Sequence, residues 1–405
     1  MPARDRRTAA AVCVAAMTAL AVAMGVGRFA FTPLFPLMVR DGLLDGQAGA
    51  WLAAANYLGY LVGALSAARI TLRPALLMSY GLAATVVITA AVGWTTALPI
   101  WIALRFLAGV ASAWTLVATG TWGLGWLAAL GRPGLAGILF SGVGLGIAGA
   151  GLFCLLAAGP APSSPRMWVG LAGLAALASL LPLAVGWRLP VYMAGSSGRT
   201  GDAARPAIST APAAPRATAG LVACYTLFGF GYILPATYLP ALARQLVDDP
   251  GVFGLAWPVF GAAAAVSTVL VSWRLAKAPR LGVWAAAHLL MAIGVLLPAV
   301  WTSLVSVTLA ALLVGGTFMV ITMVGMQEAR ARAEGQATRV LGRMTAGFAL
   351  GQLAGPLVSA GLARLTATEA AALHMALALS ALGLLGSAAW LWKTNSNIAH
   401  RKGKP

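Results

Sequence analysis

Two arginines stand inside apolar stretches of the sequence, where a charged side chain needs a partner. Arg28 lies within GVGRFAFTPLF and Arg105 within LRFLAGVASAW. Placing a charge in the middle of a bilayer costs about 2.5 to 3.5 kcal/mol on insertion scales, so each such residue calls for an explanation. A guanidinium presents a planar fork of N–H donors that suits a carboxylate or a phosphate. The pair therefore indicates a substrate-binding site for an anion or a carboxylate-bearing molecule.

No acidic residue lies in the interior of an apolar stretch to neutralise these two arginines. The nearest is Glu328, just beyond the end of the tenth stretch. One partner that could neutralise these charges is an anionic substrate. The alternative is that each arginine donates hydrogen bonds to backbone carbonyls freed near the Gly and Pro residues of the first stretch.

Five other polar side chains are candidates for substrate binding. Tyr232 and Tyr238 could donate from the second half of the chain, although a tyrosine packed between helices is as good an explanation. The other three are more often bridges between helices than ligands; they are Asn56, Tyr57 and Gln352.

The sequence carries no pattern typical of a catalytic or metal site. The three histidines are scattered, no apolar stretch holds a pair of carboxylates, and no GxxxxGK motif precedes a Ser or Thr. The cysteines, Cys13, Cys154 and Cys224, all lie in apolar segments and suggest neither disulfides nor metal binding. We therefore expect no enzyme activity, no cofactor and no metal.

The elements that carry these residues are predicted to be membrane-spanning helices. Only 9% of the 405 residues are charged and 60% are hydrophobic, whereas a soluble domain has about 25% charged residues. Twelve apolar stretches each reach the ~20 residues that one helical crossing needs. They span roughly 10–38, 47–67, 74–95, 98–127, 134–159, 166–187, 219–244, 252–273, 281–300, 303–326, 340–363 and 369–392.

The positive charges predict the orientation of these helices. Of the 27 Lys and Arg residues, 21 fall on the side of the amino terminus, four fall on the opposite side and two lie inside spans. Because cytoplasmic loops carry the excess of Lys and Arg, both termini are expected in the cytoplasm. The net charge of +18 is thus a topology signal, and no nucleic-acid partner is expected.

One segment without apolar periodicity divides the chain. Residues 188–218 combine Gly, Pro, Ser and Arg and are predicted to be a cytoplasmic linker. We expect a six-helix bundle over residues 1–187, a second over 219–392 and a cytoplasmic tail over 393–405.

The two bundles repeat one another in sequence. GVGRFAFTPLFPLMVR in the first helix and GFGYILPATYLPALAR in the seventh share two Gly, one Pro and one Arg at an offset of 204. Glycines of the fifth helix recur in the eleventh at an offset of 205, where Gly142 and Gly146 correspond to Gly347 and Gly351. Together with Gly355 and Pro356 they are expected to let helix backbones approach closely. Parallel repeats of this kind predict a pseudo-twofold axis along the membrane normal.

These features resemble the major facilitator superfamily. GVGRFAFTPLFPLM, AGAWLAAANYLGYLVGAL and TRVLGRMTAGFALGQLAGPLVSA are similar to its YbfB/YjiJ branch of bacterial transporters, over nearly the whole chain. The resemblance implies a central cavity lined by helices one, four, seven and ten, and a bacterial inner-membrane location. It also makes the loop with Arg69 and Arg73 the gating loop, although that loop lacks the acidic residue of the usual charge relay. Gly355 and Pro356 resemble an antiporter motif, but in the eleventh rather than the fifth helix, so antiport is not inferred.

The sequence thus predicts an all-α integral membrane protein, with 12 transmembrane helices in two pseudo-symmetric six-helix bundles. We expect a monomeric secondary transporter that moves a small solute, an organic anion or carboxylate, by alternating access. Its partners are the small-molecule substrate and the lipid bilayer, with protons left open as coupling ion. Efflux of hydrophobic or cationic compounds and a receptor that does not transport are the alternatives.

Overall fold

The computed structural model of the chain describes residues 3–156, 163–189, 215–246, 254–333, 335–366 and 368–402. The elements assigned in this part are all helical. The first half contains α1 (Ala3–Leu20), the π-helical segment η1 (Ala21–Phe29), α2 (Phe31–Arg40), α3 (Gly46–Ala67), α4 (Pro74–Val92), α5 (Leu98–Ala129), the 3₁₀ turn η2 (Pro133–Leu135), α6 (Ala136–Leu156) and α7 (Ser164–Arg188). The second half contains α8 (Pro215–Leu246), α10 (Ala256–Arg274), α11 (Arg280–Val300), α12 (Leu304–Ala331), α13 (Ala337–Ala363) and α14 (Glu369–Lys402).

Within the described residues, twelve helical segments are long and apolar enough to cross a membrane, which confirms the predicted number. The first of them runs through α1, η1 and α2. Of the predicted linker, residues 190–214 lie outside the described part, while α8 begins at Pro215. The helix α14 continues through residues 393–402 of the predicted tail.

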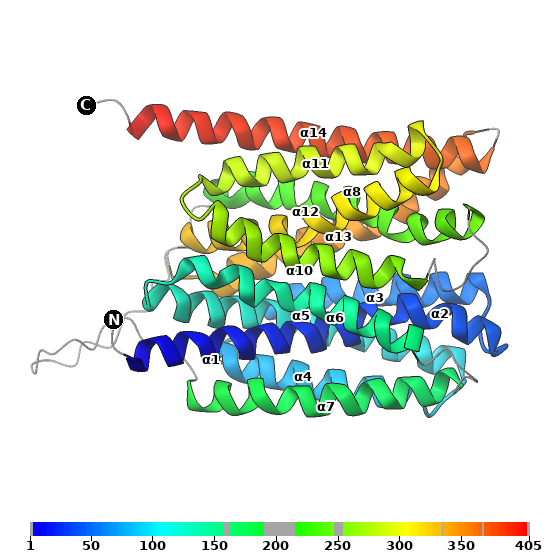
Figure 1. Cartoon of the computed structure of the whole chain (residues 1–405), viewed down its shortest axis with the longest axis horizontal. Helices are drawn as coiled ribbons and strands as arrows, with labels where there is room; N and C mark the ends of the chain where they lie inside the picture. The colour runs from blue at the N-terminus through cyan, green and yellow to red at the C-terminus, as the bar shows by residue number, and fades with distance from the viewer. Residues whose placement is uncertain are drawn as a thin grey trace, which may run out of the picture.

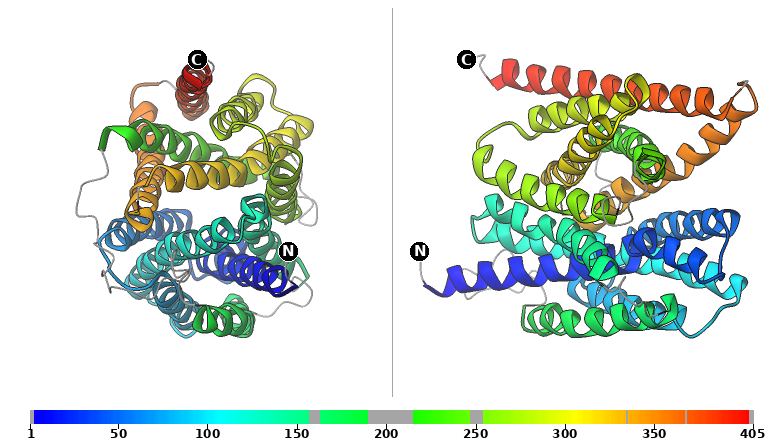
Figure 2. Two further views of the ribbon diagram at one scale, coloured as in Figure 1. Left: turned by 90° about the vertical axis from the view of Figure 1, so that its left-hand side faces the viewer. Right: turned by 45° about the vertical axis from the view of Figure 1, so that its right-hand side comes forward.

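The helices run along one axis and form two groups (Figure 1). Residues of the first half form one group and those of the second half the other, and both termini lie at the same end. The end-on view in Figure 2 shows α6 and α10 where the two groups meet. We call the end that carries both termini the terminal end and the opposite one the far end.

Glycine contacts show the internal repeat in three dimensions. A Cβ on Gly25 would overlap the backbone of Gly146, so η1 lies directly against α6. In the second half a Cβ on Gly351 would lie 3.1 Å from the carbonyl carbon of Gly229, so α13 lies against α8. The two pairs are related by the offsets of 204 and 205 found in the sequence. The same backbone approach, which only glycine permits, therefore builds both halves.

A second pair of equivalent contacts joins the halves at the terminal end. A Cβ on Gly137, in the first turn of α6, would overlap Ser272 near the end of α10. A Cβ on Gly342, in the second turn of α13, would lie 2.7 Å from Cβ of Ala68, which follows α3. Gly342 and Gly137 are 205 residues apart, and Ser272 and Ala68 are 204 apart. We call these two contacts the terminal gate.

Hydrogen bonds reinforce the terminal gate on the side of α10. The hydroxyl of Ser272 donates to the carbonyl of Gly134 in η2 and accepts from the backbone N–H of Gly137 at 3.1 Å. The side-chain amide of Gln327 in α12 donates to the carbonyl of Pro133 at 3.2 Å. The two halves are therefore in direct polar contact at this end.

Candidate functional site

A cavity of about 420 Å³ lies between the two halves. On the first half it is lined by residues of η1, α2, α3 and α5, and on the second half by residues of α8 and α10. At the far end its lining includes Gly46 and Ala50, which are exposed. Because the halves meet at the terminal gate, this conformation is closed at the terminal end and reaches the surface at the far end.

Arg28 lines this cavity and keeps an uncompensated charge. Its side chain is only 3% exposed, and its Cζ lies 3.8 Å from the centre of the Tyr60 ring. Its Nη2 donates to Oε1 of Gln352, which comes from α13 of the other half. Nε and Nη1 have no hydrogen-bond partner although both are buried. Because an amide orients a guanidinium without neutralising it, the positive charge of Arg28 remains uncompensated.

Arg105 lines the same cavity, but its terminal nitrogens are occupied. Nη1 donates to the carbonyl of Gly27 at 3.3 Å and Nη2 to the carbonyl of Arg28 at 3.2 Å. The Arg28 carbonyl stands five residues before Pro33, which has no N–H to complete a π-helical bond. Arg105 thus supplies side-chain donors to these two carbonyls, while its Cζ lies 4.7 Å from the centre of the Phe31 ring. The alternative considered from the sequence, in which an arginine donates to backbone carbonyls, therefore applies to Arg105. Arg105 also adds a second positive charge to the cavity.

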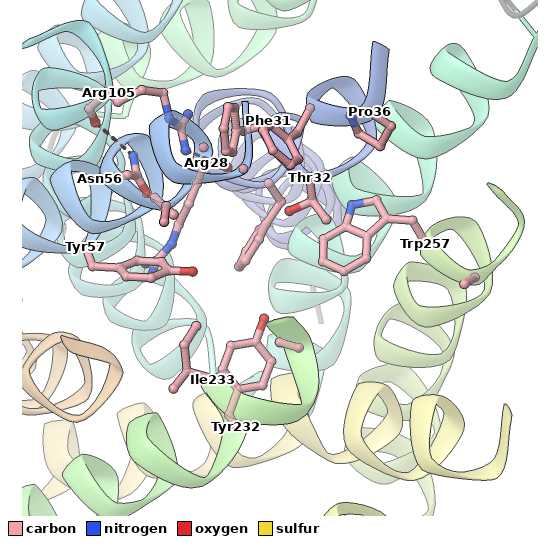
Figure 3. Close-up of a pocket in the computed structure, with 18 residues that line it drawn as sticks. Arg28, Phe31, Thr32, Pro36, Asn56, Tyr57, Arg105, Tyr232, Ile233 and Trp257 are labelled. Carbon is pink, nitrogen blue, oxygen red and sulfur yellow. Dashed lines mark hydrogen bonds between the residues drawn. The ribbon is translucent and has the colours of Figure 1, made fainter. Parts of the chain in front are cut away.

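The two predicted residues of α3 both line the cavity. Asn56 is buried, and its Nδ2 donates to the carbonyl of Arg105 at 3.0 Å, so this side chain joins α3 to α5. The ring centre of Tyr57 lies 5.7 Å from Cζ of Arg28. Figure 3 shows the Tyr57 hydroxyl facing the space between the halves.

Tyr232 brings the second half to the site. It is fully buried, stacks on Phe318 with ring centres 4.5 Å apart, and has a hydroxyl without a hydrogen-bond partner. In Figure 3 this hydroxyl points towards the side of the cavity that holds Arg28 and Tyr57. Gln352 is buried behind Arg28 rather than in the cavity wall. The side chain of Tyr238 lies outside the described part of the structure.

Sequence reasoning did not identify the aromatic lining of the cavity. Phe29, Phe31, Phe35 and Trp257 all contribute to it. Trp257 stacks on Phe260 with ring centres 5.4 Å apart and an interplanar angle of 7°. The only sequence signal was the position of Trp257 at the start of a predicted span, which is equally typical of an interfacial anchor.

The remaining predicted residues lie away from the cavity. Arg69 and Arg73 are exposed in the connection between α3 and α4, and within the described residues neither takes part in an ion pair. The predicted packing glycines lie at helix contacts. The backbone of Met17 faces Gly142, that of Ala21 faces Gly146, and the side chains of Thr226 and Ile233 face Gly347 and Gly355, next to Pro356.

Comparison with known proteins places the chain in a family. No curated protein matches the sequence. Among solved structures, the human organic anion transporter MFSD10 (TETRAN) matches with a TM-score of 0.67 over 96% of this chain and 100% of that one. The two are 15% identical, so this likeness concerns the fold. The family model described as "Uncharacterised MFS-type transporter YbfB" matches residues 20–390. With its twelve spans, its two repeated halves and a cavity between them, the chain belongs to this YbfB-like family of major facilitator superfamily transporters.

Proposed function

We propose that the protein is a secondary transporter that moves a small organic anion, a carboxylate above all, across the bacterial inner membrane. The observation that carries this proposal is the uncompensated charge of Arg28 in the cavity wall. Within the described lining residues there is no Asp or Glu, so neither arginine has an acidic partner there. Two like charges of low exposure are stabilised when an anion enters between the halves.

The placement of the contacts between the halves supports alternating access. The cavity reaches the far end, while the terminal gate holds α6 against α10 and α13 against α3. Rocking of the two halves about the cavity would open the gate and close the far end. The excess of Lys and Arg in the connections at the terminal end supports a cytoplasmic location for that end.

The absence of an acid from the described cavity lining bears on the coupling ion. Carriers driven by protons usually use a carboxylate within the membrane, and the lining offers none in the described residues. A proton could instead travel on the substrate, as the neutral form of a carboxylic acid. Exchange of one anion for another needs no titrating side chain and is also compatible with the site.

Counterflow into proteoliposomes tests this proposal. Vesicles would be loaded with unlabelled benzoate, succinate or acetate and diluted into the labelled form of the same compound. We expect transient accumulation of label for at least one carboxylate with the wild-type protein and none with Arg28→Met. Accumulation of labelled tetraphenylphosphonium alone would point to efflux of cations. If no probe accumulates, transport of this kind is contradicted and a receptor becomes the better explanation.

A further inference from the structure

The two sides of the cavity differ in chemistry. The first half contributes both arginines, whereas the described residues contributed by the second half are Tyr232, Ile233, Ala236, Ala256 and Trp257, none of them charged. A ligand between the halves therefore meets positive charge on one side and apolar or aromatic surface on the other. A molecule that matches both sides has an anionic group at one end and an apolar body at the other.

Aromatic stacking holds the apolar side in place. Tyr232 lies 12° from parallel with Phe318, and Trp257 lies 7° from parallel with Phe260. Phe29 of the first half adds an edge contact to Trp257 at 6.2 Å between ring centres. The Trp257 ring, which lines the cavity on this side, favours a planar or ring-bearing body. The polar handles on this side are the Tyr232 hydroxyl and the Trp257 Nε1, both buried without a partner.

The charged side offers guanidinium N–H groups for one anionic group. Arg28 has Nε and Nη1 without partners, whereas Arg105 has only Nε without one, because both of its terminal nitrogens are bound to carbonyls of the first span. Arg105 therefore acts as a positioning residue that holds the backbone beneath Arg28 and adds positive potential. One available guanidinium matches one carboxylate. The volume of 420 Å³ lies within the ~300 to 1,000 Å³ typical of small-molecule sites.

Resting on the proposed transport of organic anions, we infer that the substrates are monocarboxylates with an aromatic or similarly apolar body. The carboxylate lies at Arg28 in the first half, and the body lies against Tyr232 and Trp257 in the second. The two halves thus recognise opposite ends of one molecule. Loading the cavity then joins the halves through the ligand itself.

A binding panel with purified full-length protein in detergent tests the inference. The probes are benzoate, acetate, succinate, inorganic phosphate and benzyl alcohol, and the readout is ligand-induced thermal stabilisation over a concentration series. Benzoate should bind about 10-fold more tightly than acetate or succinate, because a ring buries far more apolar surface than a methyl group. Benzyl alcohol, which keeps the ring and lacks the charge, should neither stabilise the protein nor compete.

Matched tryptophan variants of α10 test the position of the ring. Trp257→Ala should weaken benzoate binding about 3- to 10-fold and leave acetate binding unchanged, because an aromatic contact is lost. Trp273→Ala is the control, since Trp273 lies on the same helix, is 68% exposed and does not line the cavity. Equal effects of both substitutions on benzoate affinity would contradict the placement of the ring at Trp257. So would an unchanged benzoate affinity in a Trp257→Ala protein that melts like the wild type.

The panel separates failure of this inference from failure of the proposed function. Suppose that succinate or phosphate binds at least as tightly as benzoate, and that this binding is lost in Arg28→Met. Anion transport then stands and the inferred substrate class is overturned. If no anion binds and none shows counterflow, both proposals fall.

Discussion

The guanidinium carbon of Arg28 lies 3.8 Å from the centre of the Tyr60 ring, on α3 of the same half. The same group donates through Nη2 to Gln352 on α13 of the opposite half. Stacking fixes the plane of the guanidinium and the amide fixes its direction, while neither removes its charge. Arg28 is therefore held in one orientation at the boundary between the halves, where a substrate would contact both.

Arg105 is expected to contribute to stability more than Arg28 does. In Arg105→Lys a single ammonium replaces the fork that serves the carbonyls of Gly27 and Arg28. We expect a loss of about 1 to 3 kcal/mol, the cost of leaving buried carbonyls unpaired. The measurement is the melting temperature in detergent, with Arg28→Met as the comparison, because removing a buried charge without an ionic partner leaves stability unchanged or higher. Equal losses in both variants would contradict the division of roles.

The glycine contact between the first and fifth spans is expected to tolerate no side chain. In Gly146→Ala the added Cβ would overlap the carbonyl of Ala21, so we predict destabilisation of about 1 to 3 kcal/mol. Gly149→Ala, three residues further along α6, is the control, since no atom lies within 4 Å of its Cβ position. Thermal unfolding of both variants makes the comparison. A melting temperature for Gly146→Ala as high as that of the control would show that the helices are further apart than described.

Gly342→Val should open the terminal gate. The new side chain would press on Ala68, whose Cβ lies 2.7 Å from the Cβ position of Gly342, and push α13 away from α3. Because closure at one end accompanies opening at the other, a cysteine placed at Ala53 in the cavity should become less reactive from the far side.

The readout for the gate is labelling of Ala53→Cys in intact cells by a membrane-impermeant maleimide. Background from Cys13, Cys154 and Cys224 should be low, since all three are buried. Gly361→Val on the same helix is the matched control, because its Cβ position is open. We expect a severalfold fall in labelling for Gly342→Val alone. Identical labelling of the two variants would exclude Gly342 as part of the gate.

Asp41 joins the first span to the sixth and should make stability depend on pH. Burial opposes ionisation of Asp41, but the backbone N–H of Ser164, 2.6 Å from Oδ2, and the neighbouring Arg40 hold the pKa of this carboxyl below its ordinary value of 3.8. Because the folded pKa is lower than the unfolded one, the stabilisation is present above pH 3.8 and is lost as the pH falls through the folded pKa.

Asp41→Asn should therefore melt below the wild type at pH 7, and the difference should shrink as the pH drops below 3.8. Melting curves at pH 7, 5 and 3 provide the measurement. A difference that stays constant or widens in acid would show that the charge of Asp41 does not stabilise the loop.

The sequence predicted the helices and their close contacts well, because hydropathy and glycine spacing can be recognised within single segments of the chain. Each span had to reach a length set by the bilayer, so α3, α5 and α11 begin and end within about two residues of prediction. The spacing of Gly146 and Gly351 was visible because close backbone contact admits no other residue type. Arg28 and Arg105 stood out because charge inside an apolar stretch is rare.

The parts of the site that the sequence did not predict depend on contacts distant along the chain. The bond from Arg28 to Gln352 joins residues 324 positions apart, and no local pattern encodes it. The carbonyls of Gly27 and Arg28 at the end of η1 accept from Arg105 of α5, a contact between distant segments that no local pattern encodes. Trp257 is recognisable as a cavity residue only once α10 lies against the first half.

Affinity for benzoate in Gln352→Glu and Arg28→Met tests the central claim most directly. Glu at position 352 keeps the shape and the position of the acceptor that holds Arg28, but adds the negative charge that the site lacks. We predict a loss of affinity of at least about 30-fold in both variants, as is typical when a buried charge loses its role in binding. Gln352→Glu should at the same time melt at or above the wild-type temperature, because the charge of Arg28 is now compensated. Benzoate affinity that is unchanged in a folded Gln352→Glu protein would contradict recognition by the free charge of Arg28.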